Sequence, residues 1–241
     1  MFELIKNLFF VVLYQPLLNL LVLLYNWMPG YDFGLSIIAL TIIIRIILFP
    51  LSIKAIKSQT ILQKIQPKIQ EIQKKYKNDK EKQAKEILNI YKNEKINPFS
   101  ALLLTIIQIP ILIALYKVFW NGLNPDELNF LYSFVYNPHQ INYLFLNIID
   151  LSKPNLILAI IAGLVQYFQT KIIQPPKQKD VSANDFTKIM QFQMIYFLPF
   201  FTIIILINLP SALGLYWTTS GLFSIIQQYF ILRVSKEKFQ N

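Results

Sequence analysis

The chain consists of long apolar stretches separated by short polar ones, with one extended polar segment in its first half. Five apolar stretches each have about the 20 residues that cross a bilayer as a helix: 33–53, 99–120, 154–173, 189–208 and 212–232. A further apolar stretch, residues 4–28, is interrupted by Tyr14, Gln15, Pro16 and Asn19. The pattern predicts an all-α polytopic membrane protein with five transmembrane helices and an N-terminal apolar helix.

Residues 4–28 fit two placements. They cross the membrane from a cytoplasmic N-terminus, or they lie in the outer interface as an amphipathic helix. We expect a span. Lys6 is the lone basic residue at the start, and no small-residue cleavage site follows the apolar run, so we interpret the segment as an uncleaved anchor.

Residues 54–98 are a helical but polar segment. The segment contains twelve lysines and five acidic residues, which gives a net charge of +7. By the positive-inside rule this charge predicts a cytoplasmic location. Apolar residues recur at alternating spacings of three and four on both sides of a polar turn at 77–80: Leu62, Ile65, Ile69, Ile72 and Tyr76, then Ala84, Ile87 and Tyr91. We therefore expect an antiparallel helical hairpin with lysines on its surface, among them Lys64, Lys68, Lys74 and Lys75.

Charges elsewhere agree with a single topology. The segment 121–153 holds Asp126, Glu127 and Asp150 against one lysine, which fits the outer side. The polar loop 174–188 and the basic residues after 232 fit the cytoplasmic side. The net charge of +10 is thus concentrated at one face of the membrane, and we expect a multi-pass protein of the cell membrane.

The composition argues against catalysis. The chain has no cysteine, which excludes disulfides and thiolate chemistry, and its one histidine, His139, lies in the predicted outer loop. No metalloprotease, hydrolase or nucleotide-binding motif occurs. We therefore expect no enzyme, no catalytic residue, no metal and no cofactor.

Arg45 lies inside the stretch 33–53, where a charge costs about 2.5–3.5 kcal/mol on insertion scales. No Asp or Glu lies deep in any apolar stretch to neutralise it. We therefore expect a hydrated cavity in the membrane, lined by Arg45 and by the polar residues of the spans: Thr41, Gln108, Gln166, Gln169, Thr170, Trp217, Thr218, Thr219 and Ser220. For each of these the alternatives stay open, because Gln and Thr also join helices and Trp also marks the interface.

Such a cavity gives a polar stretch of another protein a place to pass through the bilayer. The guanidinium attracts acidic residues of that stretch more strongly than it would in water. An opening towards lipid lets an apolar segment leave sideways, driven by its own transfer into hydrocarbon.

Four segments carry a specific resemblance: LSIIALTIIIRIILFPLSIKAIKSQ, LQKIQPKIQEIQKKY, KINPFSALLLTIIQIPILIALYKVF and LPSALGLYWTTSGLFSIIQQY. Nearly the whole chain resembles the YidC membrane protein insertases. The resemblance implies five core helices around a hydrophilic groove, which is open to cytoplasm and lipid and closed towards the outside. It implies that Arg45 is the groove cation, that Gln108 and Trp217 line the groove, and that the helical hairpin and basic tail engage nascent chains and the ribosome.

The large outer domain of many Gram-negative members is not expected, since about thirty residues precede the Arg45 helix. The chain is then an insertase and chaperone for nascent membrane proteins, alone or with the Sec translocon. Its lysines also suggest a contact with ribosomal RNA. The alternatives are a solute- or ion-coupled transporter with Arg45 as an anion site, whose usual internal repeats we do not find, and a structural subunit, which needs no unpaired charge.

Overall fold

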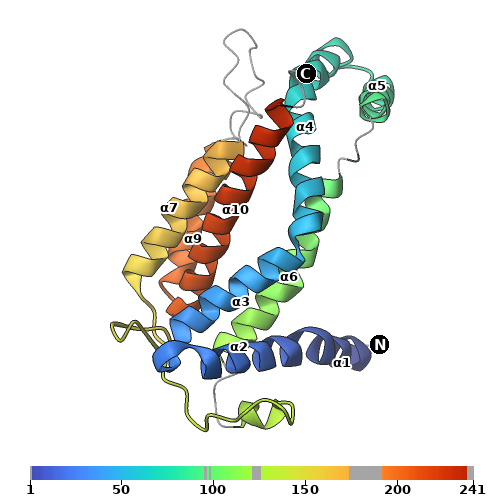
Figure 1. Ribbon diagram of the computed structural model, residues 1–241. Coiled ribbons are helices and arrows are strands. Elements are labelled where there is room, and N and C mark those ends of the chain that lie inside the picture. Colours follow the sequence, from blue (N-terminus) through green and yellow to red (C-terminus); the bar gives the residue numbers. More distant parts are fainter. Residues whose placement is uncertain (1, 95–96, 98, 121–125, 174–191, 238–241) are drawn as a thin grey trace.

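The computed structural model describes residues 2–94, 97, 99–120, 126–173 and 192–237. Helices make up most of this part of the chain (Figure 1), which confirms the predicted all-α class. The described strands form one antiparallel pair, β1 (Leu144–Phe145) and β2 (Ile149–Asp150).

The body of the protein is a bundle of tilted helices. In it, α10 packs against α7 and α3, and α9 packs against α7 (Figure 1). Its helices are α3 (Phe33–Ile47), α6 (Phe99–Trp120), α7 (Leu156–Ile173), α9 (Leu198–Leu206) and α10 (Ser211–Glu237). The predicted stretches 99–120, 154–173 and 212–232 correspond to α6, α7 and α10. The loop 174–188 and the start of the stretch 189–208 lie outside the described residues.

Small residues allow α10 and α7 to approach closely. A Cβ atom added at Gly221 of α10 would lie 2.6 Å from a methyl carbon of Val165 on α7. Most large apolar side chains of α7 and α9 point away from this contact and are exposed. This is the pattern expected of helices that pack through small residues and face lipid.

The helix predicted for residues 33–53 ends early. α3 stops at Ile47, and α4 (Phe49–Lys75) continues at an angle of 65° to it. Pro50 in the first turn of α4 explains the break, because its ring excludes the carbonyl of Ile46 and it has no N–H to donate. The span and the first arm of the helical hairpin are therefore parts of one bent helix pair.

Two π-helical turns occur next to prolines. The turns Phe10–Tyr14 and Gln193–Phe197 are each followed by a helix with a proline at its second position, Pro16 and Pro199. A proline clashes with the carbonyl four residues earlier, and a widened turn relieves that clash.

The N-terminal segment runs across one end of the bundle. α1 (Phe2–Phe9) and α2 (Gln15–Trp27) form one long rod at a steep angle to α7, α9 and α10 (Figure 1). By length and composition Glu3–Trp27 could cross a membrane. Its direction is that of a helix lying in an interface, the alternative to the span that we expected.

Polar contacts join α2 to the segment 126–155 at this end, which we call the α2 end. Buried Asn19 donates to the carbonyl oxygen of Phe130 at 3.1 Å and accepts from the N–H of Tyr132 at 2.6 Å. The Tyr14 hydroxyl donates to Glu127 at 2.8 Å, and the Tyr25 hydroxyl accepts from the N–H of Asn142 at 2.9 Å.

The predicted helical hairpin lies at the opposite end, the α5 end. α4 ends at Lys75, Asp79 caps α5 (Lys80–Asn93) by accepting from the N–H of Lys82, and the turn between them is residues 76–79. Gln83 donates to the carbonyl of Gln73, as an antiparallel pair requires. Ile65 and Ile69 are buried as predicted, whereas no residue of α5 is buried and Ala84 is exposed.

Candidate functional site around Arg45

Arg45 lies in the last turn of α3 and points towards α10. Its Nε donates to the Ser220 hydroxyl at 2.9 Å, and Nη2 donates to the same oxygen. The ion pairs found in the described part of the chain are Lys68 with Glu94 and Lys153 with Asp150, so neither of them neutralises Arg45. The partly buried guanidinium of Arg45 is thus hydrogen-bonded to a neutral hydroxyl group.

The depth of this contact follows from helix geometry. Ser220 is nine residues into α10, about 14 Å from the helix start, and Arg45 is twelve residues into α3, about 18 Å from its start. Because a bilayer's hydrocarbon core is about 30 Å thick, both positions fall near the middle of a membrane-spanning bundle.

A tyrosine and a glutamine extend the cluster. The buried Tyr216 hydroxyl accepts from Gln108 Nε2 at 2.5 Å, and Tyr216 also interacts with Ser220 and with the charge of Arg45. Gln108 comes from α6, so three helices, α3, α6 and α10, contribute to one polar cluster. The sequence pointed to Arg45 and Gln108, and the structure links them through Tyr216 and Ser220.

The polar cluster continues along α10 towards the α5 end. Tyr216, Ser220, Ser224 and Gln227 are spaced by four, four and three residues, so they share one face of the helix. Ser224 is buried and donates to the carbonyl of Ser220, and the buried Nε2 of Gln227 has no hydrogen-bond partner among the described residues. The sequence pointed to Ser220 as one of the polar residues of the last span, but not to Tyr216, Ser224 and Gln227, although their helical spacing could have revealed them.

Thr41 does not join the cluster. Its hydroxyl donates to the carbonyl of Ile37 in its own helix at 2.6 Å, and the side chain is only 1% exposed. The threonine lies one turn from Arg45, as we predicted, but its side chain sits in the packed interior. The structure therefore gives no support to Thr41 as a residue lining a cavity.

Gln166 and Trp217 form a second polar pair. Trp217 Nε1 donates to Gln166 Oε1 at 3.0 Å and so joins α10 to α7. Trp217 also lines an apolar cavity of about 280 Å³ between α6, α9 and α10, which Leu112, Ile205 and Leu213 line as well. The predicted set therefore divides between two faces of α10, Arg45 and Gln108 on one and Gln166 and Trp217 on the other.

The arrangement suits binding. Arg45 supplies hydrogen-bond donors and a positive charge, which attract carboxylates and peptide carbonyls. Within the described residues no group of three or more His, Cys, Asp and Glu side chains is placed to hold a metal. Helices with apolar outer surfaces around a partly buried cation define the class: a polytopic α-helical membrane protein with a polar cluster between its helices.

Comparison with known proteins identifies the family. Residues 23–238 match the family described as 60Kd inner membrane protein, and the chain belongs to this family, the YidC membrane protein insertases. It is 34% identical to the membrane protein insertase YidC of Fusobacterium nucleatum over 92% of this chain and 97% of that protein. The corresponding protein of Clostridium tetani is 34% identical over 88% of this chain and 87% of its own length. The YidC of Geobacter sulfurreducens is 32% identical, with 93% of this chain and 38% of that protein covered.

Proposed function

We propose that the chain inserts nascent membrane proteins into the bilayer and helps them to fold. The relatives named above carry the name membrane protein insertase, which supports this function. The observation that carries it here is Arg45, whose charge rests on the Ser220 hydroxyl at the middle of the bundle. A polar segment in transit supplies the acidic or carbonyl groups that such a cation attracts.

In this proposal the stripe on α10 and Gln108 of α6 line a hydrophilic groove. A translocating segment enters from the α5 end, follows the stripe past Gln227 and Ser224, and reaches Arg45. Water in the groove keeps the charge solvated between substrates, because an unpaired guanidinium in hydrocarbon is costly.

In this proposal the apolar cavity beside Trp217 receives the hydrophobic segment of the substrate. It lies between α6 and α9, and its lining is apolar apart from Thr202 and the polar ends of Tyr116 and Trp217. A hydrophobic segment that leaves the groove meets this surface before it enters lipid, and its burial in hydrocarbon drives the step without a nucleotide.

The α5 end is cytoplasmic in this proposal. Lys64, Lys68, Lys74 and Lys75 are all exposed on the helical hairpin, in keeping with the positive-inside rule. This surface captures nascent chains and contacts the ribosome, including its RNA, either with or without the Sec translocon. α1 and α2 then lie in the interface on the other side of the membrane.

The test compares Arg45→Ala, Arg45→Lys and the control Lys117→Gln, which removes an exposed charge elsewhere in the bundle. Proteoliposomes with each variant receive a small membrane protein whose translocated segment is acidic, and its neutral version. Arg45→Ala should slow the acidic substrate about tenfold, which corresponds to about 1.4 kcal/mol, and the neutral one less. Arg45→Lys should restore most of the rate. Equal rates for Arg45→Ala and the control would contradict an electrostatic role.

A further inference from the structure

The β-hairpin between α6 and α7 has an unusual turn. β1 and β2 pair antiparallel, Leu144 opposite Asp150 and Phe145 opposite Ile149, so residues 146–148 form the tip. Leu146 and Asn147 have positive φ angles of 52° and 56°. Such turn positions favour Gly, Asn or Asp, and a leucine there costs about 1–2 kcal/mol.

The β-hairpin is fixed to the N-terminal end of α3 through Phe145 of β1 and the backbone of Leu146, the first residue of the tip. Asp32 accepts from the N–H of Leu146 at 2.6 Å with one carboxylate oxygen and caps α3 by accepting from the N–H of Leu35 with the other. The Phe145 ring lies directly over Gly34, where an added Cβ would overlap the ring. The first turn of α3 and the β-hairpin therefore move together.

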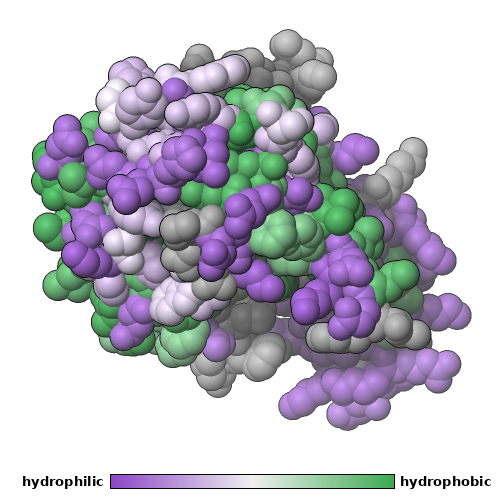
Figure 2. Space-filling view, turned by 90° about the horizontal axis from the view of Figure 1, so that it is seen from below, coloured by the Kyte–Doolittle hydropathy of each residue, from purple (hydrophilic) through white to green (hydrophobic). Residues whose placement is uncertain are grey.

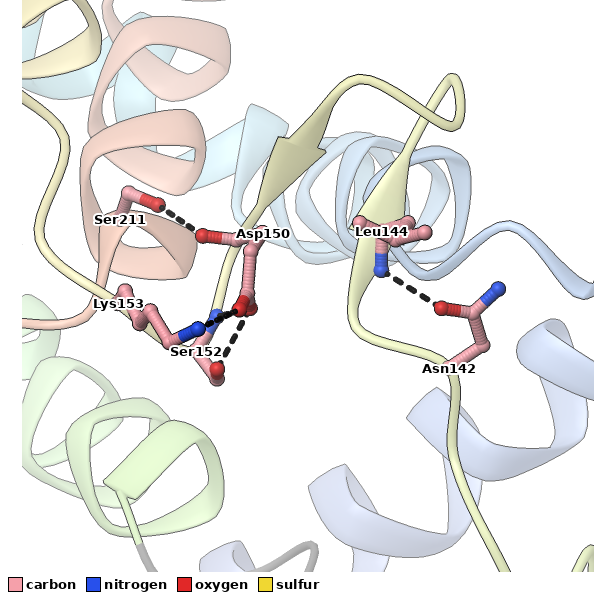
Figure 3. A network of polar contacts seen from close by, with 6 residues as sticks. All are labelled: Asn142, Leu144, Asp150, Ser152, Lys153 and Ser211. Atoms are coloured by element: carbon pink, nitrogen blue, oxygen red, sulfur yellow. Dashed lines mark hydrogen bonds and ion pairs between the residues drawn. The ribbon is translucent and has the colours of Figure 1, made fainter.

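The base of the β-hairpin is fixed to α10. The N–H groups of Ser211 and Ala212 donate to the carbonyls of Lys153 and Leu151, both at 3.0 Å. The Ser211 hydroxyl donates to the carbonyl of Asp150, whose carboxylate pairs with Lys153 (Figure 3). Figure 3 shows these side chains gathered at the base, while the turn extends away from them.

The tip itself is apolar and uncovered. Ile148 is 80% exposed and Leu146 is 55% exposed, in a turn where polar residues are usual. Residues 151–155 lead from β2 directly into α7, whose first turns expose a continuous apolar row: Leu156, Ile157, Ile160 and Ile161. Viewed from the α2 end, hydrophobic residues gather along the edge on the side where α7 lies in Figure 1 (Figure 2).

Lipid fits this tip better than protein does. Residues 151–155 join the β-hairpin to α7, whose exposed apolar row faces lipid in a membrane-spanning bundle. The nearest charge is the Asp32 carboxylate, whose two oxygens accept from the N–H groups of Leu146 and Leu35. Asp150 and Lys153 are paired with each other at the base. Two exposed side chains are too few for a stable contact between copies, which needs about 1,000 Å² of buried surface.

We propose that the tip Leu146-Asn147-Ile148 inserts into the membrane interface at the α2 end and thereby fixes the depth of α3 and α10. The same two helices hold Arg45 and Ser220, so the β-hairpin sets the depth of the polar cluster. This inference goes beyond the proposed function and does not depend on it, because it concerns only how the chain sits in lipid.

The test uses the absence of cysteine from the chain. Ile148→Cys carries a nitroxide spin label in proteoliposomes of phosphatidylcholine and phosphatidylglycerol, and collisions are measured with lipid-soluble oxygen and with a water-soluble nickel chelate. Asn129→Cys, an exposed polar position of the same segment, is the aqueous reference, and Leu164→Cys on the exposed face of α7 is the lipid reference. Leu146→Cys repeats the measurement if Ile148→Cys does not reconstitute.

We expect an oxygen-to-nickel collision ratio at position 148 that is several-fold above that at 129 and below that at 164. A ratio equal to that at 129 places the tip in water and overturns the proposal. An immobilised label that neither reagent reaches reveals a protein contact and overturns it as well.

The second half of the proposal concerns depth. In the double variant Leu146→Ser, Ile148→Ser, a label at position 156 should become more accessible to nickel, because α7 and its neighbours lose an anchor. Leu88→Ser, which removes a similarly exposed apolar side chain on α5, is the matched control and should change nothing. Unchanged accessibility in the double variant would contradict depth control by the tip.

Discussion

The two ends of the protein are built differently. At the α2 end, side chains of α2 and of the residue that caps α3 bond to a segment more than a hundred residues away, through Asn19, Tyr25 and Asp32. At the α5 end, the helical hairpin is held by local contacts such as Gln83 with Gln73 and by the ion pair of Lys68 with Glu94. One end is joined by polar bonds between segments far apart in the sequence, and the other exposes charged side chains to its surroundings. This difference is what the proposed groove, open from the α5 end alone, would need.

Removal of the helical hairpin should have the largest effect on function and little on the bundle. If residues 60–90 are replaced by a flexible linker, substrate capture and insertion should fall to a small fraction, because the lysine surface is lost. Thermal unfolding of the purified variant should stay close to that of the parent protein, since α5 buries no residue and the replaced part of α4 buries only Ile65, Ile69 and Gln70. An unfolded membrane domain would instead show that the two ends contribute alike to stability.

At the α2 end the strongest effect should come from Asn19. Asn19→Leu leaves the N–H of Tyr132 and the carbonyl of Phe130 without their partner, at a cost of about 3 kcal/mol. The matched control is Asn208→Leu, because that exposed asparagine lies in the turn after α9 and donates to the carbonyl of Ile204, four residues earlier. Thermal unfolding in detergent measures both, and equal losses would remove the distinction between the ends.

The lysines of the α5 end should act through charge alone. Replacing Lys64, Lys68, Lys74 and Lys75 by glutamine should weaken binding to ribosomes and reduce the slope of log affinity against log salt by up to about 3. Changing Lys117 and Lys153 outside the helical hairpin should leave the slope unchanged. Ribosome binding that ignores salt in the parent protein would exclude a contact with RNA.

The smallest effect concerns pH at the β-hairpin. Hydrogen bonds from the Ser152 hydroxyl, with help from Lys153, lower the pKa of Asp150 below its ordinary value of 3.8. The ionised carboxylate therefore stabilises the fold above about pH 4, and this contribution is lost as the pH falls through the lowered pKa. Asp150→Asn should cost less than about 1 kcal/mol at pH 7, since the pair is exposed, and the gap to the parent should narrow near pH 3. A gap that stays constant with pH would rule out the carboxylate as its cause.

The sequence predicted those helices well whose position depends only on the local pattern of apolar and polar residues. The stretches 99–120, 154–173 and 212–232 needed only hydropathy, and the helical hairpin needed only its three-four spacing. The bend at Leu48 was harder, because a proline near a helix end signals a kink without its angle. The direction of α1 and α2 depends on bonds such as that of Asn19 to Tyr132, which no local pattern encodes.

The candidate site was predicted only in part, because a local pattern does not encode contacts between distant helices. Arg45 and Gln108 stand out because they are polar in apolar stretches. Ser220 was one of several polar residues in its span, and only the packing of α3 beside α10 shows that Arg45 bonds to it and that Tyr216 extends the cluster. Thr41 shares a helix face with Arg45, but only the packing decides that its hydroxyl turns back to Ile37.

The most direct test of the proposed groove is the accessibility of position 220 from each side of the membrane. In the otherwise cysteine-free chain, Ser220→Cys in oriented vesicles meets a small anionic thiosulfonate reagent that does not cross lipid. A groove open to the α5 end predicts modification from that side alone, at a rate that falls when a substrate occupies it. No modification from either side, or modification from the α2 end, would contradict a hydrated passage that leads to Arg45.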